Sequence, residues 1–467
     1  MGKYDFTFDF EKISDTLRHS KARIYERRID RQLEIQASLN DWKGIGHRGL
    51  QLSQEASDLI DLAVSIYVAD RHTKRKKGLP RSIHVRLPIR STEVFLSPSI
   101  QEYLNQILFW FTADNWFFEF SKLQHPGRRL ERQINLLPPS PDGRKTEVAL
   151  WSGGLDALAG LCNRTVACSA DRFVLVGAGA NRSVWELQNT VYQSLNGCVS
   201  AELDPVRLHI ELAGTEPFRG RKNKLGRARG MVFMLLGSAY ALLEQQEALA
   251  VYENGPGALN LPFRASEVGL DHGRGVHPLS LHKVGQFISA LIGKRFEVHN
   301  PFLLWTKAEM CKVLGKLNLT DVAMQTRSCD RSPRSTIRQC GTCSSCILRR
   351  QAFLASGIND HSRYLLHHGK LDEHLRYQSK SHLPYMLNQA ARLREILKVD
   401  DAWEQLARLH PSIVGDLLHA IPESIGLTSH EFTYEIADVL RRYANEWLLP
   451  SVQREFEPEY AEMRMSK

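Results

Sequence analysis

From Thr146 onward, short apolar runs alternate with longer segments whose composition suits helices, and this alternation restricts the possible folds more than any other feature. The apolar runs lie at 148–151, 173–176, 206–210 and 249–252. Strands that are buried on both faces of a sheet form continuous apolar runs, and helices between successive strands make those strands parallel. The sequence therefore predicts an α/β fold with a doubly wound parallel sheet.

A glycine-containing loop directly follows the first of these runs and precedes a segment, 157–163, that we expect to be helical. The loop consists of Ser152, Gly153, Gly154, Leu155 and Asp156. Adjacent glycines allow a tight turn and bring backbone N–H groups close to phosphate oxygens, and the N-terminus of a following helix also favours an anion. Ser152 adds a hydroxyl donor, and Asp156 is placed to hold Mg²⁺ against a polyphosphate. An ordinary strand-to-helix turn is the alternative interpretation.

Four of the eight cysteines lie within eighteen residues, which in a reducing compartment indicates a metal site rather than disulfides. They are Cys329, Cys340, Cys343 and Cys346. Four thiolates satisfy the tetrahedral preference of Zn²⁺ and leave no open coordination position, so we expect a structural zinc site. An iron–sulfur cluster and a redox or sulfur-carrying role are alternatives. Nearby arginines either offset the negative charge of this centre or face a phosphate-bearing ligand.

The segments on either side of this region have different compositions. Residues 1–140 mix helical and strand periodicities and predict a small α+β domain, and the Pro-rich stretch 136–144 resembles a linker. We expect residues 146–360 to form the nucleotide-binding α/β domain. Residues 365–467 carry helical periodicity and no cluster of chemically reactive side chains, so they predict a helical extension.

The chain carries 61 Lys and Arg against 52 Asp and Glu, a formal net charge of +9, which favours anionic partners such as nucleotides. No stretch approaches the roughly 20 apolar residues that cross a bilayer, and the first residues lack the apolar core of a signal peptide. The expectation from these features is a cytoplasmic protein without membrane association.

The glycine loop resembles the Ser-Gly-Gly-x-Asp-Ser signature of PP-loop ATP-pyrophosphatases, which have a fold of the adenine nucleotide alpha hydrolase (HUP-like) type. Followed by the cysteine cluster and the arginines Arg349 and Arg350, it resembles the 7-cyano-7-deazaguanine synthase (QueC) family over residues 146–357. Two further stretches, Arg227-Ala228-Arg229-Gly230 and Thr306-Lys307-Ala308-Glu309, are similar to family motifs. Two positions depart from the family pattern: Ala157 replaces a serine and Gly230 replaces an asparagine.

This resemblance implies ATP and Mg²⁺ as reactants and the carboxylate of a 7-deazaguanine as the group that attacks the α-phosphate. It implies catalytic roles for Asp156, Lys307 and Arg229, around pyrophosphate held by the glycine loop. Substrate-binding roles are expected for Arg227, Glu253 and Asn254. Lys307 and Arg229 could instead be ordinary surface cations, and turn chemistry explains Asn254 equally well.

The extensions on both sides of the core resemble those of longer QueC-like proteins encoded in bacterial antiviral defence operons, including the Qat and type IV CBASS systems. That resemblance implies an operon-encoded protein as a possible partner. Two other functions stay open. The basic run from Arg71 to Arg86 suits a tRNA-modifying PP-loop enzyme, either a thiolase or a lysidine-type ligase, although the committed thiols disfavour it. The departures at Ala157 and Gly230 suit a non-catalytic, zinc-stabilised subunit of a defence complex.

Overall fold

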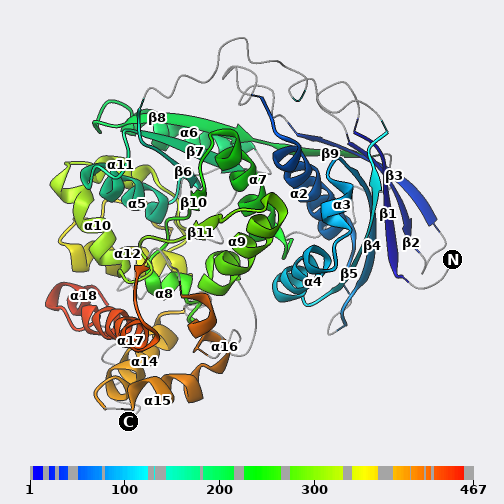
Figure 1. The fold of residues 1–467 in the computed structure, drawn as a ribbon. Helices are drawn as coiled ribbons and strands as arrows, with labels where there is room; N and C mark the ends of the chain where they lie inside the picture. The colour runs from blue at the N-terminus through cyan, green and yellow to red at the C-terminus, as the bar shows by residue number, and fades with distance from the viewer. Residues whose placement is uncertain are drawn as a thin grey trace.

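The computed structural model describes residues 4–13, 20–26, 31–39, 51–75, 79–124, 131, 143–178, 182–214, 226–263, 274–329, 339–365, 382–399, 401–414, 417–421 and 425–456. Within them the chain forms a mixed six-stranded sheet, a parallel five-stranded sheet and a helical C-terminal part (Figure 1). Most of the predicted linker lies outside the described residues. Among the described helices, none combines the length and apolar character needed to cross a membrane.

The five-stranded sheet confirms the predicted parallel α/β architecture. Its strands, in spatial order, are β11 (Glu297–His299), β10 (Ala248–Ala250), β6 (Thr146–Leu150), β7 (Arg172–Ala178) and β8 (Glu202–Leu208). All four strand pairs are parallel. The apolar run 206–210, expected as one strand, is divided at His209 between the end of β8 and the start of β9 (Ile210–Gly214).

Helices cover both faces of this sheet. They are α5 (Leu155–Val166), α6 (Arg182–Leu195), α7 (Arg229–Leu243) and α9 (Pro278–Ile292). Val148 and Leu249 belong to a hydrophobic cluster with α7 and α9, whereas their strand neighbours Ala149 and Ala250 belong to a second cluster with α5. Because successive strand residues point to opposite faces, the sheet is doubly wound. Its strand order reverses between β6 and β10.

The N-terminal residues build the mixed sheet. Its strands, in spatial order, are β5 (Asn115–Lys122), β4 (Ser82–Ile89), β1 (Phe6–Ile13), β2 (Ser20–Glu26), β3 (Arg31–Leu39) and β9. The helices α2 (Gln54–His72), α3 (Thr92–Phe95) and α4 (Pro98–Thr112) accompany it. Because β9 pairs antiparallel with β3, the chain that leaves the parallel sheet supplies an edge strand to the N-terminal sheet. One hydrophobic cluster also includes residues from both parts, so they share a core.

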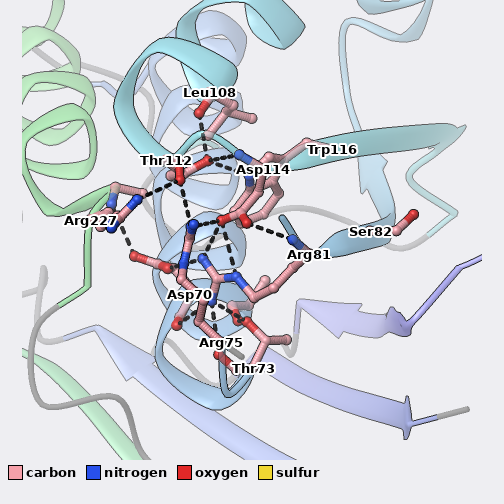
Figure 2. A network of polar contacts seen from close by, with 12 residues as sticks. Asp70, Thr73, Arg75, Arg81, Ser82, Leu108, Thr112, Asp114, Trp116 and Arg227 are labelled. Atoms are coloured by element: carbon pink, nitrogen blue, oxygen red, sulfur yellow. Dashed lines mark hydrogen bonds and ion pairs between the residues drawn. The ribbon is translucent and has the colours of Figure 1, made fainter. Parts of the chain in front are cut away.

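A buried network of charged side chains joins the N-terminal part to α7 (Figure 2). Arg81, which is 3% exposed, forms ion pairs with Asp70 at 2.7 Å and with Asp114 at 2.6 Å. Asp70 also accepts a hydrogen bond from the backbone N–H of Ala228, immediately before α7. Arg81, one member of the basic run from Arg71 to Arg86, is therefore committed to internal structure.

The remaining helices belong to the α/β part and to the C-terminal part, where α14, α15, α16, α17 and α18 lie together at the bottom of Figure 1. They are α8 (Gly255–Ala258), η6 (Arg274–Val276), α10 (Lys307–Lys316), α11 (Thr320–Gln325), α12 (Ser344–Ser356), α14 (Leu383–Ile396), α15 (Ala402–Leu409), α16 (Pro411–Val414), η7 (Leu417–Ala420), α17 (Ser429–Glu446) and α18 (Pro450–Glu455). A third hydrophobic cluster joins α14 and α17 to residues of α8 and α12. The C-terminal part is helical in every element described, as its periodicity predicts.

We expect Arg81→Ala to lower the free energy of unfolding by about 3–5 kcal/mol, because it leaves Asp70 and Asp114 buried without their shared cation. Arg86→Ala is the matched control. Arg86 is 50% exposed and pairs with the exposed Glu119, so its loss should cost about 0–1 kcal/mol. Urea unfolding followed by circular dichroism measures both effects, and equal losses for the two variants would contradict a structural role for the buried network.

Candidate functional site

The candidate site lies where the strand order of the parallel sheet reverses. The chain leaves β6 towards α5 on one face and leaves β10 towards α9 on the other, so the carboxyl ends of these two neighbouring strands border a crevice. Residues 151–156 follow β6 and residues 251–254 follow β10. Ligands of open α/β sheets bind at such positions. The topology thus brings the glycine loop together with Glu253 and Asn254.

The glycine loop has the backbone geometry that the sequence suggests. Gly153 has a φ of +70°, and a Cβ atom there would lie 2.9 Å from the Cα of Gln188, so both conformation and space require glycine. Gly154 is the N-cap of α5, and its N–H donates to Oγ of Ser152 at 3.1 Å. The N–H groups of the first helical turn have no acceptor within the helix and are available to an anion.

The side chains of the following residues divide between the site and the core. Leu155 is 1% exposed and Ala157 is 4% exposed, and both belong to the second hydrophobic cluster. Any contribution of Leu155 to phosphate binding is therefore through its backbone N–H.

At Gly230, the other departure from the family pattern, a Cβ atom would lie 2.6 Å from Cα of Gly275. Close packing of α7 against η6 explains the glycine there.

Gln188 of α6 fixes the start of the glycine loop through hydrogen bonds with Trp151, a role that the sequence did not predict. Its Nε2 donates to the carbonyl of Trp151 at 3.0 Å, and the indole N–H of Trp151 donates to the carbonyl of Gln188 at 3.3 Å. Gln188 is 3% exposed. These two reciprocal bonds fix the end of β6 against α6. A glutamine in the middle of a helix gives no local signal of such a contact.

Asp156 is the centre of the polar contacts at the crevice. Its Oδ2 forms an ion pair with Nζ of Lys307, the first residue of α10, and its Oδ1 accepts from Nδ2 of Asn254 at 3.0 Å. Nδ2 of Asn254 also donates to Oε1 of Glu253 at 2.6 Å. Four side chains predicted from the sequence therefore meet, although they are separated by up to 151 positions in the chain.

The shared environment changes the proton affinities of this group. Burial and, to a lesser extent, the neighbouring carboxylate of Asp156 raise the pKa of Glu253, Lys307 acts in the opposite direction, and the net result is a pKa of about 8. Burial by itself would lower the pKa of Lys307, but Asp156 and Glu253 outweigh that effect and raise it. Two carboxyl groups with one ammonium group make this a place where a further cation would be stabilised.

Asn254 has two structural tasks as well as its contact with Asp156. As the N-cap of α8, its Oδ1 accepts from the N–H of Gly257 at 3.0 Å. Asn300 supports the same segment, because its Nδ2 donates to the carbonyl of Glu253 at 2.7 Å. The turn chemistry expected at Asn254 is thus present, and it orients the amide towards Asp156.

The predicted residues Arg227 and Arg229 contact the N-terminal part rather than the group around Asp156. Arg227 donates to the carbonyl of Thr112 at 3.2 Å, at the edge of the buried network (Figure 2). Arg229 is exposed at the start of α7, close enough to Tyr67 of α2 to influence its pKa. His277 is the N-cap of α9, where its Nδ1 accepts from the N–H of Leu279.

The four clustered cysteines converge as expected for a metal site. Their Sγ atoms all lie within 4.8 Å of one another, and those of Cys340 and Cys346 are 3.9 Å apart. A tetrahedral centre with Zn–S bonds of about 2.3 Å requires sulfur–sulfur separations of about 3.8 Å. The backbone N–H groups of Cys340 and Cys343 point to neighbouring sulfurs at 3.3 Å, which stabilises thiolates. The donor set fits zinc in a closed, structural role.

The arginines after the cluster are committed to protein contacts. Arg349 is fully buried and donates to the carbonyl of Ala323 and to the hydroxyls of Thr326 and Ser362. Arg350 pairs with Glu455 of α18. The Arg349 contacts hold the segment after α11, whose Arg327 carbonyl would lie 3.8 Å from a Cβ atom at Gly154. Arg349, on the helix that follows the cysteine cluster, therefore anchors a segment that borders the glycine loop.

Comparisons with known proteins identify part of this region. Residues 280–357 match the family model described as "Queuosine biosynthesis protein QueC". A 72-residue stretch is 42% identical to 7-cyano-7-deazaguanine synthase of Cupriavidus pinatubonensis, covering 15% of this chain and 30% of that protein. A stretch of 72 residues is 38% identical to 7-cyano-7-deazaguanine synthase 1 of Sphingopyxis alaskensis, covering 15% of this chain and 31% of that protein. A stretch of 71 residues is 41% identical to 7-cyano-7-deazaguanine synthase of Syntrophobacter fumaroxidans, covering 15% of this chain and 29% of that protein.

The matches thus span about a third of the relatives' length. The segment matched by the family model contains β11, α10 with Lys307, α12 and all four clustered cysteines. It does not contain the glycine loop or Glu253. The connection between the matched segment and the glycine loop is consequently structural, and it is made by the contact of Lys307 with Asp156.

We expect the purified protein to hold one zinc ion per chain and Cys343→Ser to lower that content and the thermal midpoint. Cys343 is 1% exposed within the cluster, and loss of one thiolate opens the coordination shell. Cys198→Ser is the control, because Cys198 is exposed and lies outside the cluster. Elemental analysis measures the metal. Iron in place of zinc, or equal metal content in both variants, would contradict the expectation.

The raised pKa of Glu253 predicts a pH dependence of stability. In the unfolded chain this carboxyl loses its proton near its ordinary pKa of 4.5, whereas in the folded protein it does so near 8. The contribution of Glu253 to the free energy of unfolding is therefore fully present below pH 4.5 and is lost as the pH rises through 8. Glu253→Gln should raise the thermal midpoint relative to the wild type more at pH 9 than at pH 5. A difference that does not vary with pH would contradict the assignment.

Proposed function

We propose that this chain is a PP-loop ATP-pyrophosphatase that activates the carboxylate of a 7-deazaguanine for attack by an amine, with formation of AMP and pyrophosphate. The observation that carries the proposal is the ion pair between Lys307 and Asp156. Lys307 lies in the segment that matches the QueC family, and Asp156 ends the glycine loop at the switch point of the sheet. The contact thereby joins a cation of the matched segment to a loop whose backbone geometry suits phosphate binding.

The glycine loop would hold the β- and γ-phosphates of ATP. Ser152 supplies a hydroxyl, and the first turn of α5 supplies backbone N–H groups and a favourable dipole. Negative charge accumulates on pyrophosphate as it leaves, and Lys307 is the nearest buried cation in the described part of this crevice. Asp156 and Glu253 fit a divalent cation by charge and ligand type, and bound Mg²⁺ would neutralise the polyphosphate.

The reaction has two steps. A carboxylate oxygen of the deazaguanine attacks the α-phosphorus, a new P–O bond forms, and the bond between the α-phosphorus and the bridging oxygen breaks as pyrophosphate leaves. The amine nitrogen then attacks the acyl carbon of the adenylate, a C–N bond forms, AMP leaves, and the amine gives up a proton. Glu253, Asn254 and Arg227 are our candidates for substrate recognition, and Arg229 is a candidate second cation.

The acceptor amine is the finer part of the proposal. Ammonia would give an amide and, after a second activation, a nitrile, whereas a protein amine would give a conjugate. The 7-cyano-7-deazaguanine synthases that match 72 residues of this chain support ammonia as the amine, because their names specify the nitrile. The N- and C-terminal parts, which resemble those of QueC-like defence proteins, support a partner encoded in the same operon. We propose a role in anti-phage defence on that resemblance.

We expect the wild-type protein to release pyrophosphate from ATP in the presence of Mg²⁺ and 7-carboxy-7-deazaguanine, and Asp156→Asn to lower kcat/KM by about 10²-fold or more. Asp321→Asn, which changes an exposed carboxylate on α11, should have no effect. A pyrophosphate assay follows the first product. Mass spectrometry with ammonium or with co-expressed operon proteins identifies the acceptor.

The outcomes separate the candidate functions. An amide or nitrile that depends on ammonium supports nucleobase synthesis, and added mass on a partner protein supports protein modification. Pyrophosphate release only with tRNA would favour the tRNA-modifying alternative. Absence of release under all these conditions, in zinc-loaded folded protein, would overturn the enzymatic proposal.

A further inference from the structure

The first turn of α10, which presents Lys307 to Asp156, is fixed by a helix from the C-terminal part. Thr306 and Glu309 form a capping box: Oγ1 of Thr306 accepts from the N–H of Glu309 at 3.1 Å, and Oε2 of Glu309 accepts from the N–H of Thr306 at 2.8 Å. Both side chains of this box contact α17, whose residues lie outside the segment that matches the QueC family.

Arg442 of α17 contacts the Glu309 side of the capping box. Its guanidinium forms an ion pair with the Glu309 carboxylate, and its Nη2 donates to the carbonyl of Leu304 at 2.9 Å. Asp438, one turn earlier on α17, orients the same guanidinium by accepting from Nε at 2.7 Å. Arg442 thus bridges the residues on both sides of the α10 N-cap.

Glu446, one turn after Arg442, contacts the Thr306 side. Its Oε1 accepts from the hydroxyl of Thr306, which is fully buried, and its Oε2 accepts from Nε2 of Gln351 at 2.8 Å. Gln351 belongs to α12, the helix that begins at Cys343 of the cysteine cluster. The carboxyl of Glu446 therefore connects the cap of α10 to the helix that follows the metal site.

Helix α17 also packs against α8, whose N-cap is Asn254. A Cβ atom at Gly255 would lie 3.3 Å from a methyl group of Val439, and Ala258 and Leu259 share a hydrophobic cluster with Val439. Among the described residues, the side chains of Lys307 and Asn254 contact Asp156. Both helices that present them therefore rest on α17, which is itself anchored by the fully buried Trp447 immediately after it.

We propose that Arg442 and Glu446 are positioning residues of the candidate site: through the capping box of α10 they hold Lys307 against Asp156. The kinetic consequence rests on the proposed function, because it assumes that Lys307 stabilises leaving pyrophosphate. The geometric consequence does not. Without α17 the first turn of α10 loses both outer partners of its capping box, and the Lys307 ammonium gains freedom to leave the crevice.

The geometric claim is tested by the chemical accessibility of Lys307 in the full-length protein. Its side chain is 12% exposed and paired, so it should acylate slowly with an amine-reactive acetylating reagent, as followed by peptide mass spectrometry. Arg442→Ala should increase the labelling of Lys307 several-fold. Arg441→Ala is the matched control: Arg441 also pairs with Asp438 but donates to Leu397 rather than to the α10 region. Equal labelling in the two variants would overturn the proposal.

The kinetic claim is tested with a double-mutant cycle. Arg442→Ala should lower kcat/KM for pyrophosphate release by about 10- to 100-fold, mainly through kcat, whereas Arg441→Ala should leave it unchanged. In a Lys307→Ala background the Arg442 substitution should cause little further loss, because both act through the same group. Independent, multiplying losses would show that Arg442 does not act through Lys307 and would overturn the claim.

Two further variants guard against a simple loss of folding. Arg442→Lys keeps the charge and the aliphatic stem but cannot span Glu309 and Leu304. It should therefore show the same increase in Lys307 labelling as Arg442→Ala, while its thermal midpoint stays equal to that of the wild type. Glu446→Ala should increase the labelling of Lys307. Glu446→Gln retains an acceptor for the Thr306 hydroxyl, so it should keep the labelling as slow as in the wild type. If the wild type releases no pyrophosphate, the proposed function fails, and the labelling of Lys307 still decides the positioning claim on its own.

Discussion

The ion pair between Lys307 and Asp156 is the contact on which the site depends, because it joins parts of the chain that no local interaction could bring together. Asp156 is fixed by the turn from β6 into α5, and Lys307 by the capping box of α10. A buried pair of this kind gives little net stability, since desolvation of both groups offsets their attraction. Its value is positional: it holds one ammonium group beside the loop that would bind phosphate.

The composition of the crevice explains why such a pair suits a site for an anionic nucleotide. Glu253 and Asp156 lie around one ammonium group, and burial holds the pKa of Glu253 near 8. A polyphosphate with its cation would bring both the positive charge that the carboxyl groups lack and the negative charge that Lys307 and the α5 N-terminus attract. The charges of these side chains alone therefore suit a ligand that carries both a cation and an anion.

Local sequence signals were sufficient for the features built from neighbouring residues. The alternating apolar runs predict the parallel sheet, the glycine pair predicts the turn after β6, and the cysteine spacing predicts the converging sulfurs. The same signals could not show that β9 would join the N-terminal sheet or that Gln188 would lock the loop. Those contacts arise from tertiary packing between distant segments, and a polar residue within a helix carries no sign of its partner.

The N-terminal and C-terminal parts each contact the start of a helix of the α/β part. In the N-terminal part Asp70 accepts from the N–H of Ala228, at the start of α7, and in the C-terminal part Glu446 and Arg442 hold the start of α10. Helix N-termini carry unsatisfied N–H groups, so a side chain from another module can both satisfy them and fix their position. Because α7 and α10 begin with Arg229 and Lys307, each flanking part contacts a helix start that carries a cation. The extensions are thus better understood as parts of the site's framework than as independent attachments.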